Sequence, residues 1–222
     1  AERALALARA AVEAATERIA DDPDGPERAE LASTIEIGAA FPDDVGVVVA
    51  LLLNHVVLAP GQALFLGAGN VHAYLRGVAV EVMANSDNVI RGGLTPKHID
   101  VEELAAIVDR SWGPVPVQTA STPVHTYEVP IPDFSLTRID ASAGPLGAIE
   151  IEPTGPEIVL VTAGALAIET PGSVIGLGRG QAAFVGPGTG PVRLRFDRDG
   201  LGPAGGTGSP ALAWRVTVGR AG

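Results

Sequence analysis

The chain has 222 residues, a hydrophobic content of 46%, charged residues at 18% and a formal net charge of −11. These values indicate a globular protein and argue against nucleic acid or anionic membrane as general partners, because an acidic surface repels both. Cysteine is absent, which excludes disulfides and thiolate catalysis, so a metal ion would have to bind His, Asp, Glu or Gln.

The first part of the chain is predicted to be helical. Residues 2–19 repeat apolar side chains at the spacing of an amphipathic helix. The Asp- and Pro-rich segment 21–26 ends this helix, and residues 27–33 resume it for about two turns. Charges run through residues 1–20, so this segment is not a signal peptide, and no segment has the length of a membrane span. Since the chain has no initiator Met, we expect it to begin inside a longer protein.

Asp44 is a candidate N-cap for a further helix over residues 45–53. This segment is almost wholly apolar and should be buried. The run Val47–Val49 leaves a β-strand as the alternative.

Residues 60–97 come next, with the densest set of reactive side chains. A short apolar run, Gln62–Leu66, precedes a glycine turn at residues 67–70. Strands are predicted over residues 71–75 and 78–83. Because alternate residues of a strand share a face, the side chains of His72 and Tyr74 should point the same way.

Beyond this region, Asp100 and Glu103 form a capping-box pattern that predicts a helix to about residue 110. Residues 112–116 are a linker rich in proline. From residue 126 to residue 218 short alternating runs are separated by Gly and Pro, most clearly at residues 134–139 and 192–196. Many short strands with turns at these intervals predict a sandwich or jelly roll.

An internal repeat supports this interpretation. The segment GQALFLGAG at residues 61–69 recurs as GQAAFVGPG at residues 180–188. In the same register, Pro191 stands opposite His72. The second copy is therefore expected to keep the turn and to lose the histidine.

The spacing of Gly61, Gly67, Gly69 and His72 resembles the second conserved motif of the cupin superfamily. That family usually has proline at the position of Gly67, and Arg76 stands where its asparagine is expected. Residues 72–97, HAYLRGVAVEVMANSDNVIRGGLTPK, are similar to the active-site segment of type I mannose-6-phosphate isomerases, zinc-dependent enzymes built from cupin domains.

This resemblance implies a cytoplasmic enzyme of carbohydrate metabolism, an isomerase that interconverts mannose 6-phosphate and fructose 6-phosphate by zinc-assisted proton transfer through an enediolate. The chain would correspond to the C-terminal part of that enzyme. The predicted fold is mainly β with a helical N-terminal segment: a cupin or jelly-roll protein with one partial catalytic cupin and one complete, metal-free cupin. The expected divisions are residues 1–53 (helical), 54–112 (second half of the catalytic cupin with its helix) and 113–222 (C-terminal cupin).

The resemblance makes His72 a zinc ligand and Arg91 a catalytic residue. From spacing alone, His72 would more often be a hydrogen-bonded histidine on a strand. The usual role of a lone loop arginine is at the surface or in an ion pair. In an aldose–ketose isomerisation, a fixed guanidinium near the enediolate oxygen would stabilise the developing negative charge.

Three further residues are candidates for the same site. Glu81, within an apolar run, is the second candidate catalytic residue, a carboxylate that could take part in proton transfer. The resemblance places it in the active-site wall, and a solvent-facing strand residue is its alternative. Tyr74 could hydrogen-bond sugar hydroxyls or be half-buried in the core. Lys97 could meet an anionic group or form an ion pair with Asp87 or Asp100.

The resemblance also implies three other zinc donors, a Gln and a His spaced Q-x-H and a Glu, all upstream of a helical segment like residues 2–19. No Q-x-H or H-x-H occurs in the chain, and His55, His98 and His125 are isolated. We therefore expect that the chain lacks the front half of the enzyme and is inactive alone. The alternatives are completion in trans by a separate chain that supplies the missing N-terminal half, and a non-enzymatic sugar-binding or regulatory cupin.

Overall fold

The computed structural model describes residues 2–86, 88–144, 146–196 and 210–218. Contacts group the chain into two compact units. Unit 1 comprises residues 1–58, 66–80 and 86–116, and unit 2 comprises residues 59–65, 81–85 and 117–222. The three-way division expected from the sequence stays a prediction.

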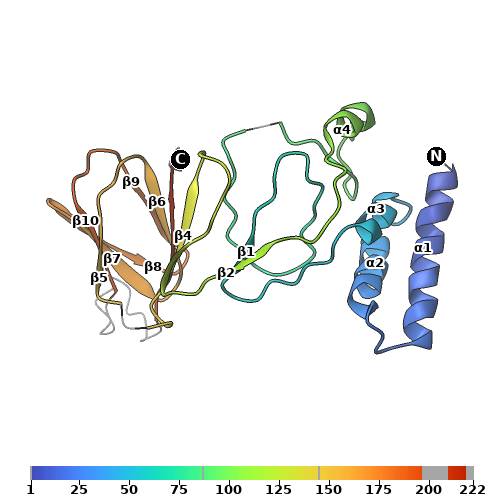
Figure 1. Cartoon of the computed structure of the whole chain (residues 1–222), viewed down its shortest axis with the longest axis horizontal. Helices are drawn as coiled ribbons and strands as arrows, with labels where there is room; N and C mark the ends of the chain where they lie inside the picture. The colour runs from blue at the N-terminus through green and yellow to red at the C-terminus, as the bar shows by residue number, and fades with distance from the viewer. Residues whose placement is uncertain (1, 87, 145, 197–209, 219–222) are drawn as a thin grey trace. The chain divides into compact units, whose positions relative to one another are not determined.

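Unit 1 contains the helices, seen in Figure 1: α1 (Glu2–Asp21), α2 (Arg28–Ala40), α3 (Gly46–Leu52) and α4 (Val101–Ile107). The helices predicted over residues 2–19 and 45–53 are confirmed, and the strand alternative for the second is wrong. The helix after Asp100 is confirmed with its cap, since the Glu103 amide donates to the Asp100 carboxylate at 3.0 Å. None of the described helices is both long and apolar enough to cross a membrane.

Helix α2 is longer than the sequence pattern predicts, because its polar residues are accommodated locally. The hydroxyls of Ser33 and Thr34 donate to the carbonyls one turn earlier, at 2.9 Å each. Gly38 lets α2 approach α1, since a Cβ there would lie 2.4 Å from the Val12 side chain. A small apolar core then joins three of the helices, with Ala8, Ile37 and Val47 buried.

Unit 2 contains the strands, all paired antiparallel. A two-stranded sheet joins β1 (Gln62–Leu64) and β2 (Val117–Thr119). A four-stranded sheet has the order β5 (Ala148–Ile151), β10 (Val192–Arg195), β7 (Ala165–Thr170), β8 (Ser173–Gly178). A five-stranded sheet has the order β3 (Val124–Thr126), β4 (Ser135–Asp140), β11 (Leu212–Thr217), β6 (Glu157–Ala163), β9 (Ala182–Val185).

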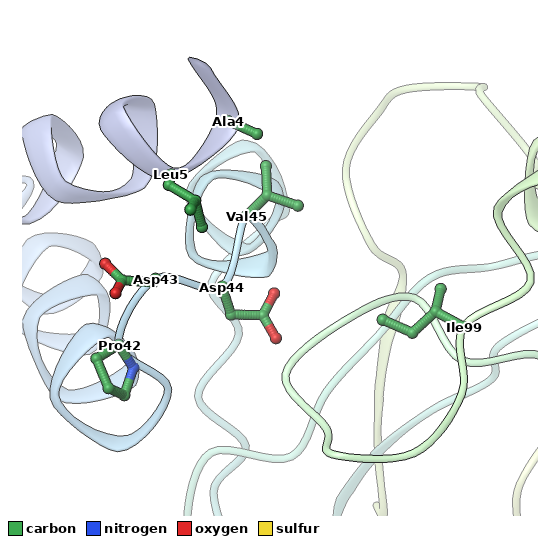
Figure 2. A pocket seen from close by; sticks show the side chains of 7 residues that line it. All are labelled: Ala4, Leu5, Pro42, Asp43, Asp44, Val45 and Ile99. Atoms are coloured by element: carbon green, nitrogen blue, oxygen red, sulfur yellow. The ribbon is translucent and has the colours of Figure 1, made fainter. Parts of the chain in front are cut away.

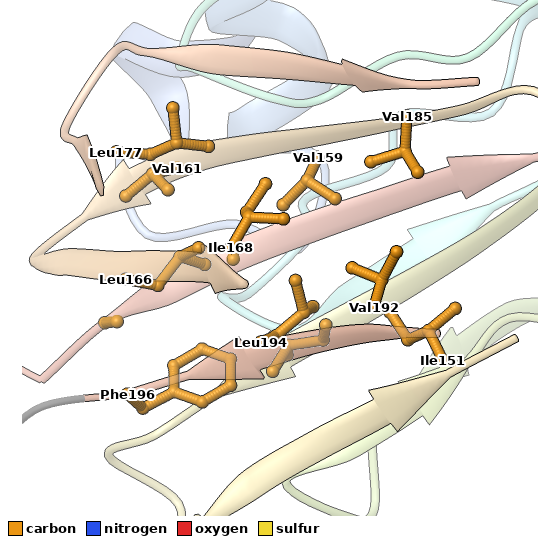
Figure 3. Packing of buried hydrophobic residues seen from close by; sticks show 13 residues of the cluster. Ile151, Val159, Val161, Leu166, Ile168, Leu177, Val185, Val192, Leu194 and Phe196 are labelled. Carbon is orange, nitrogen blue, oxygen red and sulfur yellow. The ribbon is translucent and has the colours of Figure 1, made fainter. Parts of the chain in front are cut away.

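Both larger sheets contribute to one apolar core, shown in Figure 3. The predicted alternation of residues 192–196 is confirmed, because Val192, Leu194 and Phe196 are all buried in this core. On β6, Val159 and Val161 alternate in the same way. Unit 2 is therefore an antiparallel sandwich, and the predicted class, mainly β with a helical N-terminal segment, is confirmed.

The two copies of the internal repeat form the same turn. Gly61 and Gly180 have φ angles of 85° and 82°, and Gly69 and Gly188 have φ angles of 77° and 81°. In both copies the glutamine accepts from an amide three residues earlier: Gln62 from Ala59 at 2.9 Å and Gln181 from Gly178 at 2.7 Å. An amide-to-carbonyl bond of 3.3 Å closes the second turn of each copy. The sequence repeat therefore corresponds to two turns of the same backbone structure.

The strands predicted over residues 71–75 and 78–83 are wrong for this structure. Their backbone is irregular, and no backbone–backbone hydrogen bond between described residues involves residues 71–99. A strand exists only where a neighbouring strand satisfies its amides and carbonyls. The apolar alternation of these segments meets no such neighbour among the described residues.

Candidate active site

His72 comes directly after the first copy of the repeat, and its turn is held in place by a glycine. Gly69 has a left-handed φ, its carbonyl accepts from the Asp109 amide at 3.0 Å, and a Cβ there would lie 2.5 Å from the Ile107 carbonyl. No other residue fits this close approach. The turn before His72 is therefore anchored to the segment after α4.

The His72 ring is exposed and oriented by the backbone. Its Nδ1 lies 2.9 Å from the Asn70 carbonyl oxygen. A carbonyl oxygen only accepts, so Nδ1 is the donor, and in the neutral form of the ring Nε2 carries the lone pair. A metal-binding histidine is commonly oriented in this way by a backbone carbonyl.

Tyr74 lies beside His72, as alternate residues were expected to. The two ring centroids are 5.7 Å apart with an interplanar angle of 64°, an edge-to-face contact. The Tyr74 side chain is 70% exposed, so it is not a core residue.

Arg91 and Lys97 lie at the ends of a loop that is attached to the helices. The loop's central residue, Leu94, packs against the core of unit 1 and has a positive φ of 52°. Its amide donates to one oxygen of the Asp44 carboxylate at 2.9 Å, while the other oxygen accepts from the Gly46 amide at 2.7 Å. Asp44 therefore holds both the start of α3 and the loop.

The guanidinium of Arg91 is exposed, and it forms no ion pair or hydrogen bond with a described residue. Lys97 is exposed as well, and its predicted ion pair with Asp100 is not formed. Asp87, the other predicted partner, lies outside the described residues. Both cations are thus available to an anionic ligand.

Glu81 belongs to unit 2 and its side chain is exposed, in irregular backbone rather than in the predicted strand. It interacts with another group, so Glu81 is not without a partner. The solvent-facing alternative fits its exposure, whereas its placement in an active-site wall stays a prediction.

A hollow of about 450 Å³ in unit 1 was not anticipated from the sequence; it is shown in Figure 2. Asp43 and Asp44 line it, together with Leu5, Val45 and Ile99 among others. Their carboxylates point in different directions and are already engaged (Figure 2). A bidentate pair with Arg9 lowers the pKa of Asp43 through hydrogen bonding, and Asp44 binds two backbone amides. None of the predicted site residues lines this hollow, which is unsuited to a sugar phosphate.

The described residues do not form a complete zinc site. No group of three or more His, Asp or Glu in that part of the chain is arranged to hold a metal ion. His55 is engaged with the Ser33 hydroxyl at 3.1 Å, and His125 stacks edge-on against Tyr127. His72 alone, with its oriented ring and available Nε2, fits one ligand position of such a site.

No protein-family model matches the chain. It is, however, 40% identical over 162 residues to the mannose-6-phosphate isomerase of Salmonella typhimurium, covering 70% of this chain and 40% of that protein. It is 36% identical over 168 residues to mannose-6-phosphate isomerase 1 of Arabidopsis thaliana, covering 74% of this chain and 38% of that protein.

Solved structures agree with the sequence relatives. The Salmonella typhimurium enzyme bound to its substrate, fructose 6-phosphate, and to zinc matches with a TM-score of 0.73 and 34% identity, over 99% of this chain and 50% of that chain. Structures of that enzyme with single alanine substitutions of a histidine, a glutamate and an arginine match as well. The predicted resemblance and the predicted fold are therefore confirmed, and the chain spans about half the length of the proteins it matches or less.

Proposed function

Because this chain is similar to mannose-6-phosphate isomerases in sequence and fold over about half of their length or less, we propose that it forms part of an enzyme that interconverts mannose 6-phosphate and fructose 6-phosphate. Within that enzyme, His72 donates one nitrogen to zinc and Arg91 stabilises the enediolate. Glu81 lies in the active-site wall, Tyr74 binds sugar hydroxyls, and Lys97 meets an anionic group of the substrate.

One observation supports this assignment above the others. The histidine, glutamate and arginine replaced in the Salmonella enzyme are separated along that chain by the same intervals as His72, Glu81 and Arg91 are here. Three residues of the right types at two identical intervals are not expected from a resemblance of fold alone. These intervals are preserved across a segment that has no strand in this structure.

The positive charge of Arg91 suits the proposed isomerisation. Isomerisation moves a proton between adjacent carbons through an intermediate with negative charge on oxygen. A guanidinium is charged at every working pH and presents several donors in one plane. Since Arg91 is not engaged by a described carboxylate, and its loop is fixed through Leu94 and Asp44, it is available to meet that charge in a defined position.

In this proposal, the remaining zinc donors come from the part of the enzyme that this chain does not match. A catalytic zinc takes about three protein ligands, and His72 is one. The chain contains no Q-x-H sequence. We therefore expect the isolated chain to be inactive and to bind zinc only weakly.

A non-enzymatic sugar-binding cupin is the second candidate function. The observation that favours it is the lack of a three-donor cluster in the described part of the chain. Such a protein would bind a sugar without metal, and it would gain neither zinc nor activity when combined with the other half of an isomerase.

The test is a chimera in which this chain replaces the matching part of the Salmonella typhimurium enzyme. We expect it to bind zinc and to isomerise mannose 6-phosphate. His72→Ala should remove both zinc and activity, whereas Arg91→Ala should keep zinc and lower kcat by about 10²–10³. The exposed His98 and Arg179 provide the controls His98→Ala and Arg179→Ala, which should change neither.

Two results would contradict the proposal. An unsubstituted chimera that folds without binding zinc or turning over substrate would remove the enzymatic function from this chain. Full zinc content in His72→Ala, or near-normal turnover in Arg91→Ala, would remove that residue from its role.

A further inference from the structure

Unit 2 has a hollow of its own, with a volume of about 260 Å³, called the unit 2 hollow below. It is lined by residues of β3, β4 and β11 from the five-stranded sheet and of β5, an edge strand of the four-stranded sheet. Ile151 in its wall is paired with Val192, the first residue of β10 (Figure 3). The hollow therefore lies at the end of the sandwich where the second turn of the repeat leads into β10.

The wall of the unit 2 hollow combines apolar and polar side chains. Thr137 and Arg215 lie two residues from the core residues Ile139 and Ala213, so they share the inner face of the sheet. Ligand pockets usually place a few polar groups in such an apolar wall, and their volumes begin at about 300 Å³. The apolar side chains that line the hollow are Val124, Ile139, Ile149 and Ile151. Its size and lining suit a ligand no larger than a monosaccharide.

Arg215 is fixed with part of its guanidinium left unused. The buried Glu157 carboxylate accepts from Nε of Arg215 at 2.6 Å and from one of its terminal nitrogens. The other terminal nitrogen, Nη1, forms no hydrogen bond with a described residue, and it is not buried. Because Arg215 lines the hollow, the two N–H groups of Nη1 are held ready to donate to oxygen atoms of a ligand.

The charges around the unit 2 hollow disfavour an ionic ligand. Arg215 is neutralised by Glu157, and Glu150 pairs with Arg193 at 3.2 Å. Glu152 is exposed and forms no ion pair with a described residue. Among the described residues of the wall, an anion would thus meet an unpaired carboxylate and no unpaired cation, and a cation would meet the N–H groups of Arg215. A neutral ligand with hydroxyl groups avoids both repulsions.

We propose that the unit 2 hollow is a binding site for a neutral polyol of monosaccharide size. Arg215 and the Thr137 hydroxyl bind its oxygens, and the apolar side chains of the wall contact its C–H groups. The site is composed of other residues than the candidate active site and uses no metal. It therefore does not depend on the proposed function.

The experiment titrates the isotope-labelled full chain with neutral probes, namely D-glucose, D-mannose and myo-inositol, and follows the amide shifts by NMR. We expect at least one probe to cause saturable shifts in β4 and β5, with a Kd on the order of 1 mM, and none in β8. Inorganic phosphate is the anionic probe, and it should cause no saturable shift in β4 or β5.

Two threonines separate ligand binding from stability. Thr126 and Thr137 share a hydrogen bond between their hydroxyls at 2.8 Å, but of the two only Thr137 lines the hollow. Thr137→Val and Thr126→Val both break this bond, whereas only the first removes a group that meets the ligand. We expect Thr137→Val to raise Kd by about tenfold and Thr126→Val by less than about twofold.

A second pair of variants tests the location by filling the hollow. Val124, in its wall, is partly exposed on β3, so Val124→Phe should be accommodated and should abolish binding. Val174 is exposed on β8 outside the wall, so Val174→Phe should leave Kd unchanged.

Three results would overturn the proposal. The first is the absence of saturable shifts in β4 and β5 with all three neutral probes up to about 50 mM. The second is binding of inorganic phosphate there at least as tightly as the neutral probes. The third is an equal loss of affinity in the two threonine variants, or undiminished binding in Val124→Phe.

Discussion

Residues 61–69 and 180–188 form one turn twice, with matching φ angles and matching glutamine hydrogen bonds, yet the chain beyond them has two different structures. After the second copy it is a central strand of a sheet, and after the first it has no strand partner among the described residues. The glutamine hydrogen bond and the closing bond of each turn join residues three apart. The strand depends on neighbours that, among the described residues, only the second copy has.

The two units differ in how far their ion pairs are exposed to water. In unit 2, Arg215 forms a bidentate pair with Glu157, whose side chain is almost fully buried. In unit 1, one guanidinium nitrogen of Arg76 donates to both carboxylate oxygens of Glu36, at 3.0 and 2.9 Å, and both side chains are largely exposed. An arginine–glutamate pair has a large effect on stability only where water is excluded.

Breaking the buried Arg215–Glu157 pair should therefore have the largest effect on the free energy of unfolding. Arg215→Ala leaves the Glu157 carboxylate buried without its partner and should cost about 3–5 kcal/mol in the free energy of unfolding of unit 2. Arg76→Ala should cost at most about 1 kcal/mol. Urea unfolding followed by tryptophan fluorescence in a Trp112→Phe background, in which Trp214 is the only tryptophan, measures the first. Helical circular dichroism measures the second. A cost below about 1 kcal/mol for Arg215→Ala would show that the pair is not buried as described.

The next largest effect on stability is expected from the leucines at equivalent positions after the two turns. Leu194→Ala should destabilise unit 2 by about 3 kcal/mol, because it leaves a cavity in the core. Leu75→Ala should change the stability of the isolated chain by less than about 0.5 kcal/mol, since that side chain is exposed and no described strand covers it. Chemical unfolding of the two variants provides the measurement. Equal costs would mean that Leu75 is packed like Leu194.

Acid should destabilise unit 2 through Asp140. Burial would raise the pKa of this carboxyl, but hydrogen bonds from Ser142 and the Arg138 guanidinium lower it below its usual value. A lowered pKa stabilises the fold above the usual carboxyl pKa of about 3.9, and this stability is lost as pH falls through the folded value.

The stability of unit 2 should therefore fall below about pH 4, and Asp140→Asn should flatten that dependence. Denaturant unfolding from about pH 6 down to about pH 3, which spans the carboxyl range, tests this expectation. The exposed Asp43, whose pKa the Arg9 hydrogen bond lowers, serves as the matched control: Asp43→Asn should leave the pH profile of unit 2 unchanged. An equally steep fall in Asp140→Asn would assign the effect to other carboxyls.

The smallest expected effect on stability comes from the glutamine that both copies of the turn share. Gln62→Ala and Gln181→Ala each remove one hydrogen bond from a backbone amide and should each cost about 1 kcal/mol. Gln62→Ala also removes an exposed 3.4 Å bond to the Thr119 hydroxyl, which should add little. Both glutamines belong to unit 2, so the same fluorescence measurement reports both. Costs that differ by more than about 1 kcal/mol would show that the two turns are not equivalent in energy.

Sequence reasoning succeeded where structure depends on near neighbours. The Asp100 cap and the glutamine hydrogen bonds of the two glycine turns join residues three apart, and the alternation of residues 192–196 is visible in the sequence itself. It failed for residues 71–75 and 78–83, because an alternating pattern indicates a preference for a strand and cannot supply the partner.

In the candidate site too, contacts between residues close in the sequence were predicted, and contacts between distant residues were missed. The resemblance pointed to His72 and Arg91, whose roles stay predictions, and alternation correctly placed Tyr74 beside His72. The anchoring of the Arg91 loop by Asp44 was missed, since Asp44 and Leu94 are 50 residues apart and only a local cap was visible in the pattern. A positive φ at Leu94, a residue type that rarely adopts one, has no sequence signal.

The most direct test of the account is amide hydrogen exchange of the isolated chain, comparing residues 73–76 with residues 192–195. Four consecutive amides of equivalent position are read in each copy, after turns of the same geometry. The account predicts exchange near the unprotected rate for the first set and exchange slower by orders of magnitude for the second. Comparable protection of both sets would contradict it.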